Sequence, residues 1–345
     1  MPAISFIGNI AADLGSTNTY ILTDEKAAVY SCASAVLVDA KRPTDVYATG
    51  DEARHMDGRT GDEALLVSPI SFGGIADSEL AAILILSAIE KASGKHKPLE
   101  KCRLTLSVNE GSTRVERAAL VNAAQLAGAK KVFVVKAPVA AAVSMKRHID
   151  KAEAQLIVSI GSNVTEVSVI SAGSIVLNRH AKTGSSAFDD AITEYVRRKH
   201  GLVIPKGVAM ELKRDLGSAV KTDMENVQTL SGRDIRNGRP VTAEINSGEI
   251  CDALSGPVSA LVSTICDALF NIPSEFSNDI LRNGICLTGG GSEMYMLAER
   301  LKNETGLDVY QSAEPRFDTV RGLMRIASDD RLARQIMSAY SAYEI

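Results

Sequence analysis

Three short segments combine glycine with serine, threonine or asparagine, and such residues can surround an anion. Two read Asp13-Leu-Gly-Ser-Thr-Asn-Thr19 and Ser159-Ile-Gly-Ser-Asn-Val-Thr165, and the third is Gly289-Gly-Gly-Ser292. Backbone N–H groups and hydroxyls in turns of this kind form a concave array that suits phosphate oxygens. A glycine turn that opens a helix adds the positive end of the helix dipole. One such turn is more often only a turn, but the three together predict phosphate binding.

The first two segments are similar to each other. Gly15 aligns with Gly161 and Thr19 with Thr165, at a constant separation of 146 residues. Each segment lies between two apolar stretches typical of strands, so each is interpreted as the turn of a β-hairpin. Two similar hairpins half a chain apart predict two related halves.

The elements that must position these turns alternate between strands and helices. A strand at 103–108, a helix opened by the capping box Thr113 to Glu116, and a strand at 131–135 predict a βαβ unit. Further helices are expected at 77–92, after Pro138, at 188–200 and at 257–270, and further strands at 27–39, 156–160, 165–171, 284–288 and 307–311. The polar stretch 221–239 is interpreted as variable. The class expected is α/β.

Composition and charge exclude several classes of protein. The chain has 345 residues, 45% of them hydrophobic, which is enough for two or three domains with a sizeable core. Lys and Arg number 38 against 42 Asp and Glu, a net charge of −4 without a long basic run, so no nucleic-acid partner is expected. The five scattered cysteines predict reduced thiols. We find no secretory signal and no apolar run of membrane-spanning length, so a cytoplasmic location is expected.

Taken together, the motifs resemble bacterial actin, specifically the MreB family. The resemblance rests on the first turn, on Thr165-Glu-Val-Ser-Val-Ile-Ser171, on the stretch from Ala187 to His200 and on Leu287-Thr-Gly-Gly-Gly291. These segments follow the family's order and nearly its spacing over almost the whole chain. Near the end, the stretch from Phe317 to Ala327 is closer to the magnetosome filament actin, which gives a second subfamily to consider.

The resemblance implies an actin-like fold with two related large subdomains, each on a five-stranded mixed sheet, two small subdomains and a nucleotide cleft between the halves. The implied boundaries are 1–30, 69–143 and 320–345 for subdomain IA, 31–68 for IB, 144–180 and 245–319 for IIA, and 181–244 for IIB. It also implies ATP or ADP with Mg²⁺ as ligand and head-to-tail assembly into homopolymeric protofilaments.

The family's nucleotide-binding positions carry over residue by residue. Asp13 falls on the carboxylate that holds Mg²⁺ through water, and Lys213, with Glu211 nearby, falls on the helix that lines the nucleoside. The remaining positions form the first phosphate turn, the second phosphate turn and the adenosine-facing turn: Gly15, Ser16, Thr17 and Asn18; Gly161, Ser162, Asn163, Val164 and Thr165; Gly289, Gly290 and Gly291.

The chain departs from the family around this nucleotide. Ser159 stands where the family has an Asp that helps to hold the Mg²⁺ hydration shell, and Ser162-Asn-Val164 replaces Gly-Gly-Thr. Lys136-Ala137 replaces the Glu-Glu pair in which a Glu orients the attacking water. Other changes are Met210 at a ribose-contacting Glu and Gly184-Ser-Ser186 in place of Gly-Gly-Asp.

These departures predict that hydrolysis suffers more than binding. Loss of a water-orienting base costs about 10²- to 10⁴-fold in rate, whereas backbone N–H groups can still bind phosphate. At most a weak ATPase is expected, with no confident catalytic residue. Lys136 allows two interpretations: an ammonium that approaches the phosphates, or, more often for such a residue, a solvated lysine at a strand end.

Three functions remain open. The first is a cytoskeletal protein with a role in cell shape, or, in the magnetosome-type alternative, in positioning an organelle. The second is a monomeric ATPase or kinase of the same superfamily, and the third is a scaffold without nucleotide that assembles with an intact paralogous actin.

Residues 2–7 are an apolar strip that could contact the inner face of the membrane, although a strand edge is the more frequent role. Glu110 and Glu116 are expected to be capping or surface carboxylates, and no metal-type spacing occurs among the five histidines.

Overall fold

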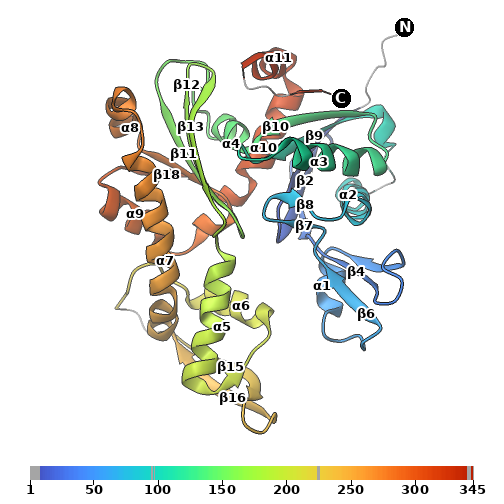
Figure 1. Cartoon of the computed structure of the whole chain (residues 1–345), viewed down its shortest axis with the longest axis vertical. Coiled ribbons are helices and arrows are strands. Elements are labelled where there is room, and N and C mark those ends of the chain that lie inside the picture. The colour runs from blue at the N-terminus through green and yellow to red at the C-terminus, as the bar shows by residue number, and fades with distance from the viewer. Residues whose placement is uncertain (1–7, 95, 97, 224–225, 340–342, 345) are drawn as a thin grey trace. The chain divides into compact units, whose positions relative to one another are not determined.

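The computed structural model describes residues 8–94, 96, 98–223, 226–339 and 343–344 (Figure 1). The apolar strip at 2–7 therefore lies outside the described residues. Internal contacts divide the chain into two compact units: residues 1–157, 168–178 and 317–345 form unit 1, and residues 158–167 and 179–316 form unit 2.

Unit 1 contains a six-stranded mixed sheet. Its order is β19-β10-β9-β1-β2-β3, in which β1, β9 and β10 run parallel and the other strands are antiparallel to their neighbours. The strands are β1 (Gly8–Leu14), β2 (Asn18–Thr23), β3 (Tyr30–Ala33), β9 (Cys102–Val108), β10 (Lys131–Lys136) and β19 (Tyr343–Glu344). Five of them correspond to the expected five-stranded sheet, and the two-residue β19 is added at its edge.

Two helices with well-defined caps cover this sheet and share its apolar core, α2 (Ser78–Ser93) and α3 (Arg114–Leu126). The Asp77 carboxylate accepts from the N–H groups of Glu79 and Leu80, and Gly94 ends α2 in a left-handed conformation. The predicted capping box of Thr113 and Glu116 opens α3. The βαβ unit expected from the sequence is confirmed. The short η1 (Leu99–Lys101) leads into β9.

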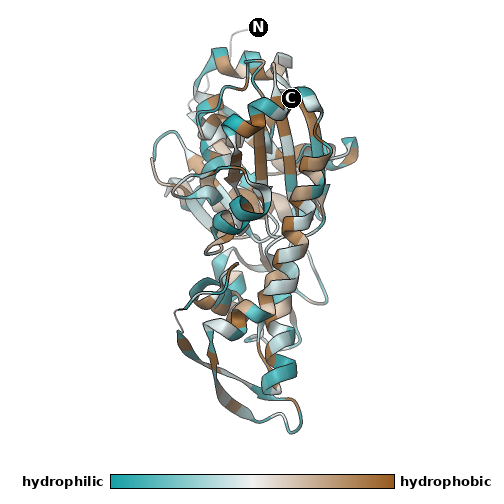
Figure 2. Cartoon of the chain, turned by 90° about the vertical axis from the view of Figure 1, so that its left-hand side faces the viewer, coloured by the Kyte–Doolittle hydropathy of each residue, from teal (hydrophilic) through white to brown (hydrophobic). Residues whose placement is uncertain are grey.

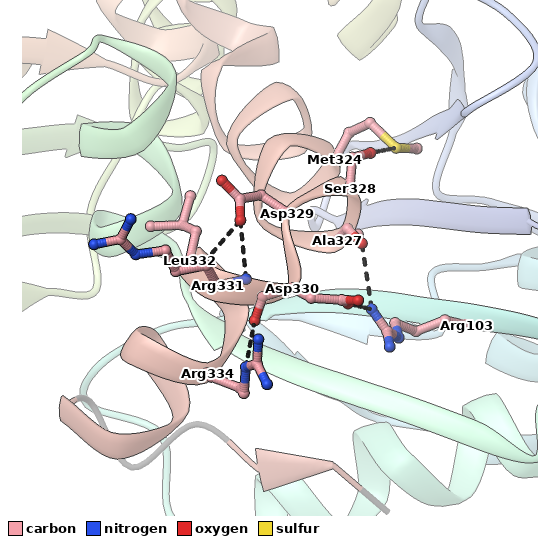
Figure 3. Close-up of polar contacts among 9 residues, drawn as sticks. All are labelled: Arg103, Met324, Ala327, Ser328, Asp329, Asp330, Arg331, Leu332 and Arg334. Atoms are coloured by element: carbon pink, nitrogen blue, oxygen red, sulfur yellow. Dashed lines mark hydrogen bonds and ion pairs between the residues drawn. The ribbon is translucent and has the colours of Figure 1, made fainter. Parts of the chain in front are cut away.

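The remaining helices of unit 1 are α4 (Ala137–Ser144), α10 (Asp318–Ser328) and α11 (Asp330–Ala339). Helices α4 and α10 pack against each other, as seen in Figure 1. The Arg325 guanidinium donates to the carbonyls of Val143 and Ser144 at the end of α4. Figure 3 shows the corner between α10 and α11, where Arg103 of β9 donates to the Ala327 carbonyl and pairs with Asp330 at 3.2 Å.

A smaller sheet of unit 1 has the order β5-β4-β6, with its own small core of alanine and leucine side chains. Its elements are β4 (Val36–Asp39), β5 (Val46–Thr49), α1 (Asp51–Met56) and β6 (Ala64–Val67), followed by the hairpin of β7 (Ile70–Ser71) and β8 (Gly74–Ile75). The expected strand at 27–39 is thus two strands, β3 and β4, in different sheets.

A second large sheet has five strands in the order β13-β12-β11-β17-β18, as expected. They are β11 (Gln155–Ile160), β12 (Thr165–Ser171), β13 (Ser174–Ala181), β17 (Ile285–Thr288) and β18 (Val309–Gln311). The β12 strand is buried along its whole length. In Figure 2 several strands in the body of the molecule are mostly brown, whereas the helices that face the viewer carry both teal and brown residues.

The helices of unit 2 surround a three-stranded sheet of order β14-β15-β16 and the ends of the large one. They are α5 (Ser186–His200), α6 (Lys206–Leu216), α7 (Ser247–Phe270), α8 (Ser277–Asn283) and α9 (Leu297–Thr305). Three short 3-10 turns accompany them: η2 (Ser274–Phe276), η3 (Gly290–Glu293) and η4 (Pro315–Phe317). The last residue of η4, Phe317, is where the chain returns to unit 1. The small strands are β14 (Leu202–Val203), β15 (Val227–Asp234) and β16 (Pro240–Asn246). The stretch 221–239, interpreted as variable, therefore holds β15.

Helix α7 is longer than expected because a capping box of Asn246 and Glu249 opens it ten residues before Pro257. Within the part of the chain that the structure describes, it is the one helix whose length and hydropathy would allow it to cross a membrane. A third of that apolar stretch is buried, including the face with Leu254, Val258 and Ile265. One face of α7 is therefore packed against the protein.

Candidate functional site

The first glycine turn, Gly15–Thr17, joins β1 to β2 in unit 1. The Gly15 N–H donates to the Asn18 carbonyl at 3.1 Å and closes the turn. A Cβ atom at Gly15 would lie 2.7 Å from that carbonyl oxygen, which is closer than real Cβ contacts allow. The position therefore requires glycine for local reasons, before any ligand is considered.

The carbonyl oxygens of this turn all accept hydrogen bonds from other parts of unit 1. Ser34 donates from its hydroxyl to the Gly15 carbonyl at 2.6 Å and from its N–H to the Thr17 carbonyl at 2.9 Å. The Arg54 guanidinium also donates to the Thr17 carbonyl, at 2.6 Å, and the Ser68 hydroxyl donates to the Ser16 carbonyl at 3.3 Å. In a trans peptide the N–H points opposite to the C=O. The N–H groups of Ser16, Thr17 and Asn18 consequently point away from these donors, in the arrangement that an anion needs.

Asp13 lies on β1, two residues before the turn. Its carboxylate accepts a hydrogen bond of 2.6 Å from the Ser107 hydroxyl of β9. Burial raises the pKa of the Asp13 carboxyl, and the bond from Ser107 partly opposes this rise. No group of three or more His, Cys, Asp or Glu side chains placed to hold a metal occurs in the described ranges. Asp13 thus offers one carboxylate of the kind that can hold a hydrated cation.

The second glycine turn, in unit 2, repeats the closing bond of the first. The Gly161 N–H donates to the Val164 carbonyl at 2.9 Å, and a Cβ atom at Gly161 would lie 2.9 Å from the same oxygen. The similarity between Gly15 and Gly161 in the sequence is therefore a similarity of turn geometry. The larger Ser162, Asn163 and Val164 side chains are accommodated without loss of this bond.

The carbonyls of the second turn are also bonded to the protein, here by the segment before α5. Ser185 N–H donates to Gly161 at 3.0 Å, and the N–H and hydroxyl of Ser186 donate to Ser162 at 2.9 and 2.8 Å. A Cβ atom at Gly184 would lie 2.5 Å from both carbonyl oxygens, so this close approach requires glycine. The N–H groups of Ser162 and Asn163 then point away from this segment.

Thr165 contributes to this support instead of facing the turn's open side. Its hydroxyl donates to the Thr183 carbonyl at 2.9 Å, and the residue is buried. Ser159, at the family's carboxylate position, is half-buried on β11.

The third glycine turn packs directly on the second within unit 2. Gly289 has φ +87°, and its Cβ would lie 2.5 Å from the Ile160 carbonyl oxygen. A Cβ at Gly291 would lie 2.5 Å from the Ile160 side chain and 3.1 Å from the Gly161 carbonyl oxygen. Gly290 is exposed and starts η3. Two of the three predicted turns are thus brought together in one unit.

Lys213 is held at the start of α5. Its ammonium lies 2.7 Å from the Asp189 carboxylate and donates to the Ser185 carbonyl at 3.2 Å. Burial raises the pKa of Asp189, and the charge of Lys213 opposes the rise. Glu211 is exposed, and residues two apart on a helix do not share a face, so its side chain is directed away from that of Lys213.

The structure corrects the interpretation of Lys136 as a solvated lysine. Its ammonium lies 2.7 Å from one oxygen and 3.0 Å from the other oxygen of Glu110, and both side chains are only about a quarter exposed, at 25% and 22%. Glu110 is likewise a partner in an ion pair, not a free surface carboxylate, whereas Glu116 forms the expected capping box. Ala137 is the first residue of α4.

Several supporting residues were not identified from the sequence. Ser34, Arg54 and Ser68 hold the first turn, but they lie 16 or more residues away from it and carry no motif. Ser185 and Ser186 were noticed only as departures from a family pattern, although they bind the second turn. Because their contacts are with backbone carbonyls, no spacing in the sequence indicates them.

The arrangement of each unit fits a polyphosphate by its own geometry. The carbonyls of Gly15, Ser16 and Thr17 in unit 1, and those of Gly161 and Ser162 in unit 2, accept hydrogen bonds from the protein. The N–H group of each following residue points the opposite way. Unit 1 adds a carboxylate at Asp13, and unit 2 adds a glycine surface at Gly289–Gly291. These are groups suited to binding an anion.

Comparisons with known proteins identify similar sequences and structures. The model of the MreB/Mbl protein family matches residues 7–335. Over 320 residues, 92% of each chain, the sequence is 33% identical to the cell shape-determining protein MreB of Escherichia coli. Crystal structures of MreB5 of Spiroplasma citri bound to ADP and to AMPPNP superimpose with TM-scores of 0.86 and 0.87 at 28% identity, covering 96% of this chain and 98% of theirs.

A more distant neighbour is the MamK double helical filament. Its TM-score is 0.75 at 20% identity, and the match covers 93% of this chain and 99% of that one. At this identity the likeness shows the actin-like fold alone.

Proposed function

The chain belongs to the MreB/Mbl family of bacterial actin-like cytoskeletal proteins, and from this we propose that it assembles head-to-tail into filaments that help to determine cell shape. Its relatives in Escherichia coli are described as determining cell shape. A head-to-tail contact that does not close generates a filament by symmetry alone. The proposal includes a cytoplasmic location, with contact at the inner face of the membrane and with a paralogous actin as further partners.

The observation that carries the nucleotide part of this proposal is the repeated turn. Gly15 and Gly161 close equivalent turns whose carbonyls are occupied and whose N–H groups are directed away from the supporting protein. We assign a phosphate-binding role to each turn within its own unit, and we assign the adenosine to the glycine surface of Gly289–Gly291 and to Lys213, both in unit 2. The related MreB5 structures are bound to ADP and AMPPNP, which supports this assignment.

Mg²⁺ belongs to the same proposal. Asp13 would hold the hydrated cation through water, and a bound cation would neutralise part of the phosphate charge. Ser159 adds no second carboxylate, so the donor set on this chain is small.

We further propose that hydrolysis is weak. A water-orienting carboxylate is missing at Lys136-Ala137, and the Glu110 carboxylate is engaged by Lys136. Positioned general bases contribute about 10²- to 10⁴-fold to rates, so turnover should fall by that order while binding through backbone groups persists.

The boundaries expected above for subdomains IA, IB, IIA and IIB are part of the same proposal.

A magnetosome-type filament that positions an organelle is a second candidate, suggested by the resemblance of the stretch from Phe317 to Ala327 to the magnetosome filament actin. It is the less favoured one, because the relatives with 30% identity or more are cell shape-determining proteins. Both candidates are filaments, and they differ in what the filament serves in the cell.

Sedimentation of the purified chain tests the assembly. Samples without nucleotide, with ATP and Mg²⁺, and with AMPPNP and Mg²⁺ are centrifuged, and the pellets are viewed by negative-stain electron microscopy. We expect filaments that respond to nucleotide. Soluble protein under every condition would instead support a monomeric enzyme, and filaments indifferent to nucleotide would support a scaffold.

A further inference from the structure

The strand order of unit 1 places one ion pair beside the first glycine turn. Strands β1, β9 and β10 are parallel neighbours, so their carboxyl ends lie at one edge of the sheet. Ala12 is level with Leu106, and Val108 is level with Lys136. Continued by two residues, this register puts Lys136 level with Leu14, the residue before the turn. Two strand spacings, roughly 10 Å, separate the backbones of Lys136 and Leu14.

The pair itself holds the lysine in place. Lys136 Nζ contacts both carboxylate oxygens of Glu110, at 2.7 and 3.0 Å, and three quarters of each side chain is covered. A free lysine loses rotamer entropy when it is fixed. Glu110 has already fixed this one, so a ligand that uses the ammonium meets less of that cost.

The surroundings of Lys136 favour an anion. Helix α4 begins at the residue after Lys136 and presents the positive end of its dipole at this edge of the sheet. Glu110 is the group that competes with an incoming anion for the ammonium. Removal of its charge should therefore strengthen anion binding, and removal of the Lys136 charge should weaken it.

We propose that Lys136 is a fixed cation for the phosphate groups of the nucleotide, that Glu110 positions it, and that binding consequently depends little on Mg²⁺. The inference rests on the nucleotide binding proposed above. Lys136 acts as a binding residue, and Glu110 acts through Lys136 as a positioning residue.

Anisotropy of a fluorescent ATP analogue, with Mg²⁺ or with EDTA, tests this. We expect the affinity of the unaltered chain to change by no more than about threefold when Mg²⁺ is removed. Lys136→Met should weaken binding in EDTA by about tenfold, as expected for loss of a charged partner. Lys136→Arg should retain most of the affinity. The matched control is Lys131→Met, at the opposite end of the same strand, which should leave affinity unchanged.

Glu110→Gln separates an electrostatic role from a structural one. Glutamine keeps an acceptor oxygen that still positions the Lys136 ammonium, but it removes the charge that competes with the phosphate. Glu110→Gln should therefore tighten ATP binding by about threefold, the direction opposite to Lys136→Met. A purely structural ion pair predicts lower thermal stability for both variants with equal affinities. Equal affinities in folded variants would overturn the inference and leave nucleotide binding intact. Failure of the unaltered chain to bind the analogue in either condition would overturn the nucleotide proposal and the inference together.

Discussion

The first and second glycine turns each leave no room for a Cβ atom at their glycine. Gly15 and Gly161 each lack the Cβ that would collide with the carbonyl three residues later, at 2.7 and 2.9 Å. Neither has a positive φ, so the requirement is one of space. The same steric limit in both halves explains why these glycines align in the sequence.

Gly15→Ala and Gly161→Ala should each lower the free energy of unfolding by about 1–3 kcal/mol, because the turn must open to admit the methyl group. Urea unfolding measures this. Gly61→Ala is the control, since a Cβ there meets nothing within 4 Å. Equal stability of Gly15→Ala and Gly61→Ala would show that the turn is softer than its geometry indicates.

Lys213 neutralises a buried carboxylate. Asp189 is 3% exposed and pairs with Lys213 at 2.7 Å. Lys213→Ala should cost about 3 kcal/mol, because it leaves Asp189 buried without its cation. The control is Lys206→Ala on the same helix, whose pair with Asp190 is exposed and 3.8 Å long, and it should cost less than about 1 kcal/mol.

The defect of Lys213→Ala should also depend on pH. Burial raises the pKa of Asp189 above its unfolded value, so the folded state binds the proton more tightly and stability falls as pH rises through the shifted pKa. Without the Lys213 ammonium, this loss of stability with rising pH is larger. Urea midpoints of Lys213→Ala should therefore recover as pH is lowered from neutral, and a defect independent of pH would contradict the account.

At the scale of elements, helices α4 and α10 approach closely because one residue has no side chain. A Cβ at Gly322 would lie 1.8 Å from the Ala140 carbonyl oxygen, and Arg325 donates to the last carbonyls of α4 one turn further along. Both helices belong to unit 1, and α10 packs on β1, which carries Asp13. The pair therefore supports the strand that carries the first turn.

Gly322→Ala should be among the most destabilising alanine substitutions in the chain, at about 3 kcal/mol, since a backbone carbonyl cannot move aside as a side chain can. Thermal unfolding followed by circular dichroism checks this. Gly256→Ala, within α7 and with nothing near its Cβ, should instead be neutral or stabilising. Similar behaviour of the two variants would mean that α10 shifts freely against α4.

Elements with local signals could be predicted from the sequence. The Asp77 cap, the Thr113 capping box and the alternating strand at 103–108 specify α2, α3 and β9 through residues next to each other. The β15–β16 hairpin was missed because its exposed strands are rich in polar residues and lack a clear apolar alternation. In the site, the glycines were found, but their supports were not, because Ser34, Arg54 and Ser186 bind backbone atoms far along the chain.

For the whole molecule, binding and hydrolysis have separate structural requirements. In the function proposed above, nucleotide binding uses turn N–H groups that the fold supplies in each unit, and the closing bond of the second turn survives the side-chain changes at 162–164. The proposed hydrolysis defect follows from carboxylates that Ser159 and Lys136-Ala137 do not provide. An actin-like filament with these features should bind nucleotide and assemble while turning it over slowly.

Phosphate release measured in the same tubes as sedimentation tests this central claim most directly. With ATP and Mg²⁺, the chain should form pelletable filaments with release about 10²- to 10⁴-fold slower than that of Escherichia coli MreB assayed in parallel. The variant Ser159→Asp with Ala137→Glu should release phosphate faster at equal polymer mass. Filaments of the unaltered chain that release phosphate as fast as MreB would contradict the claim.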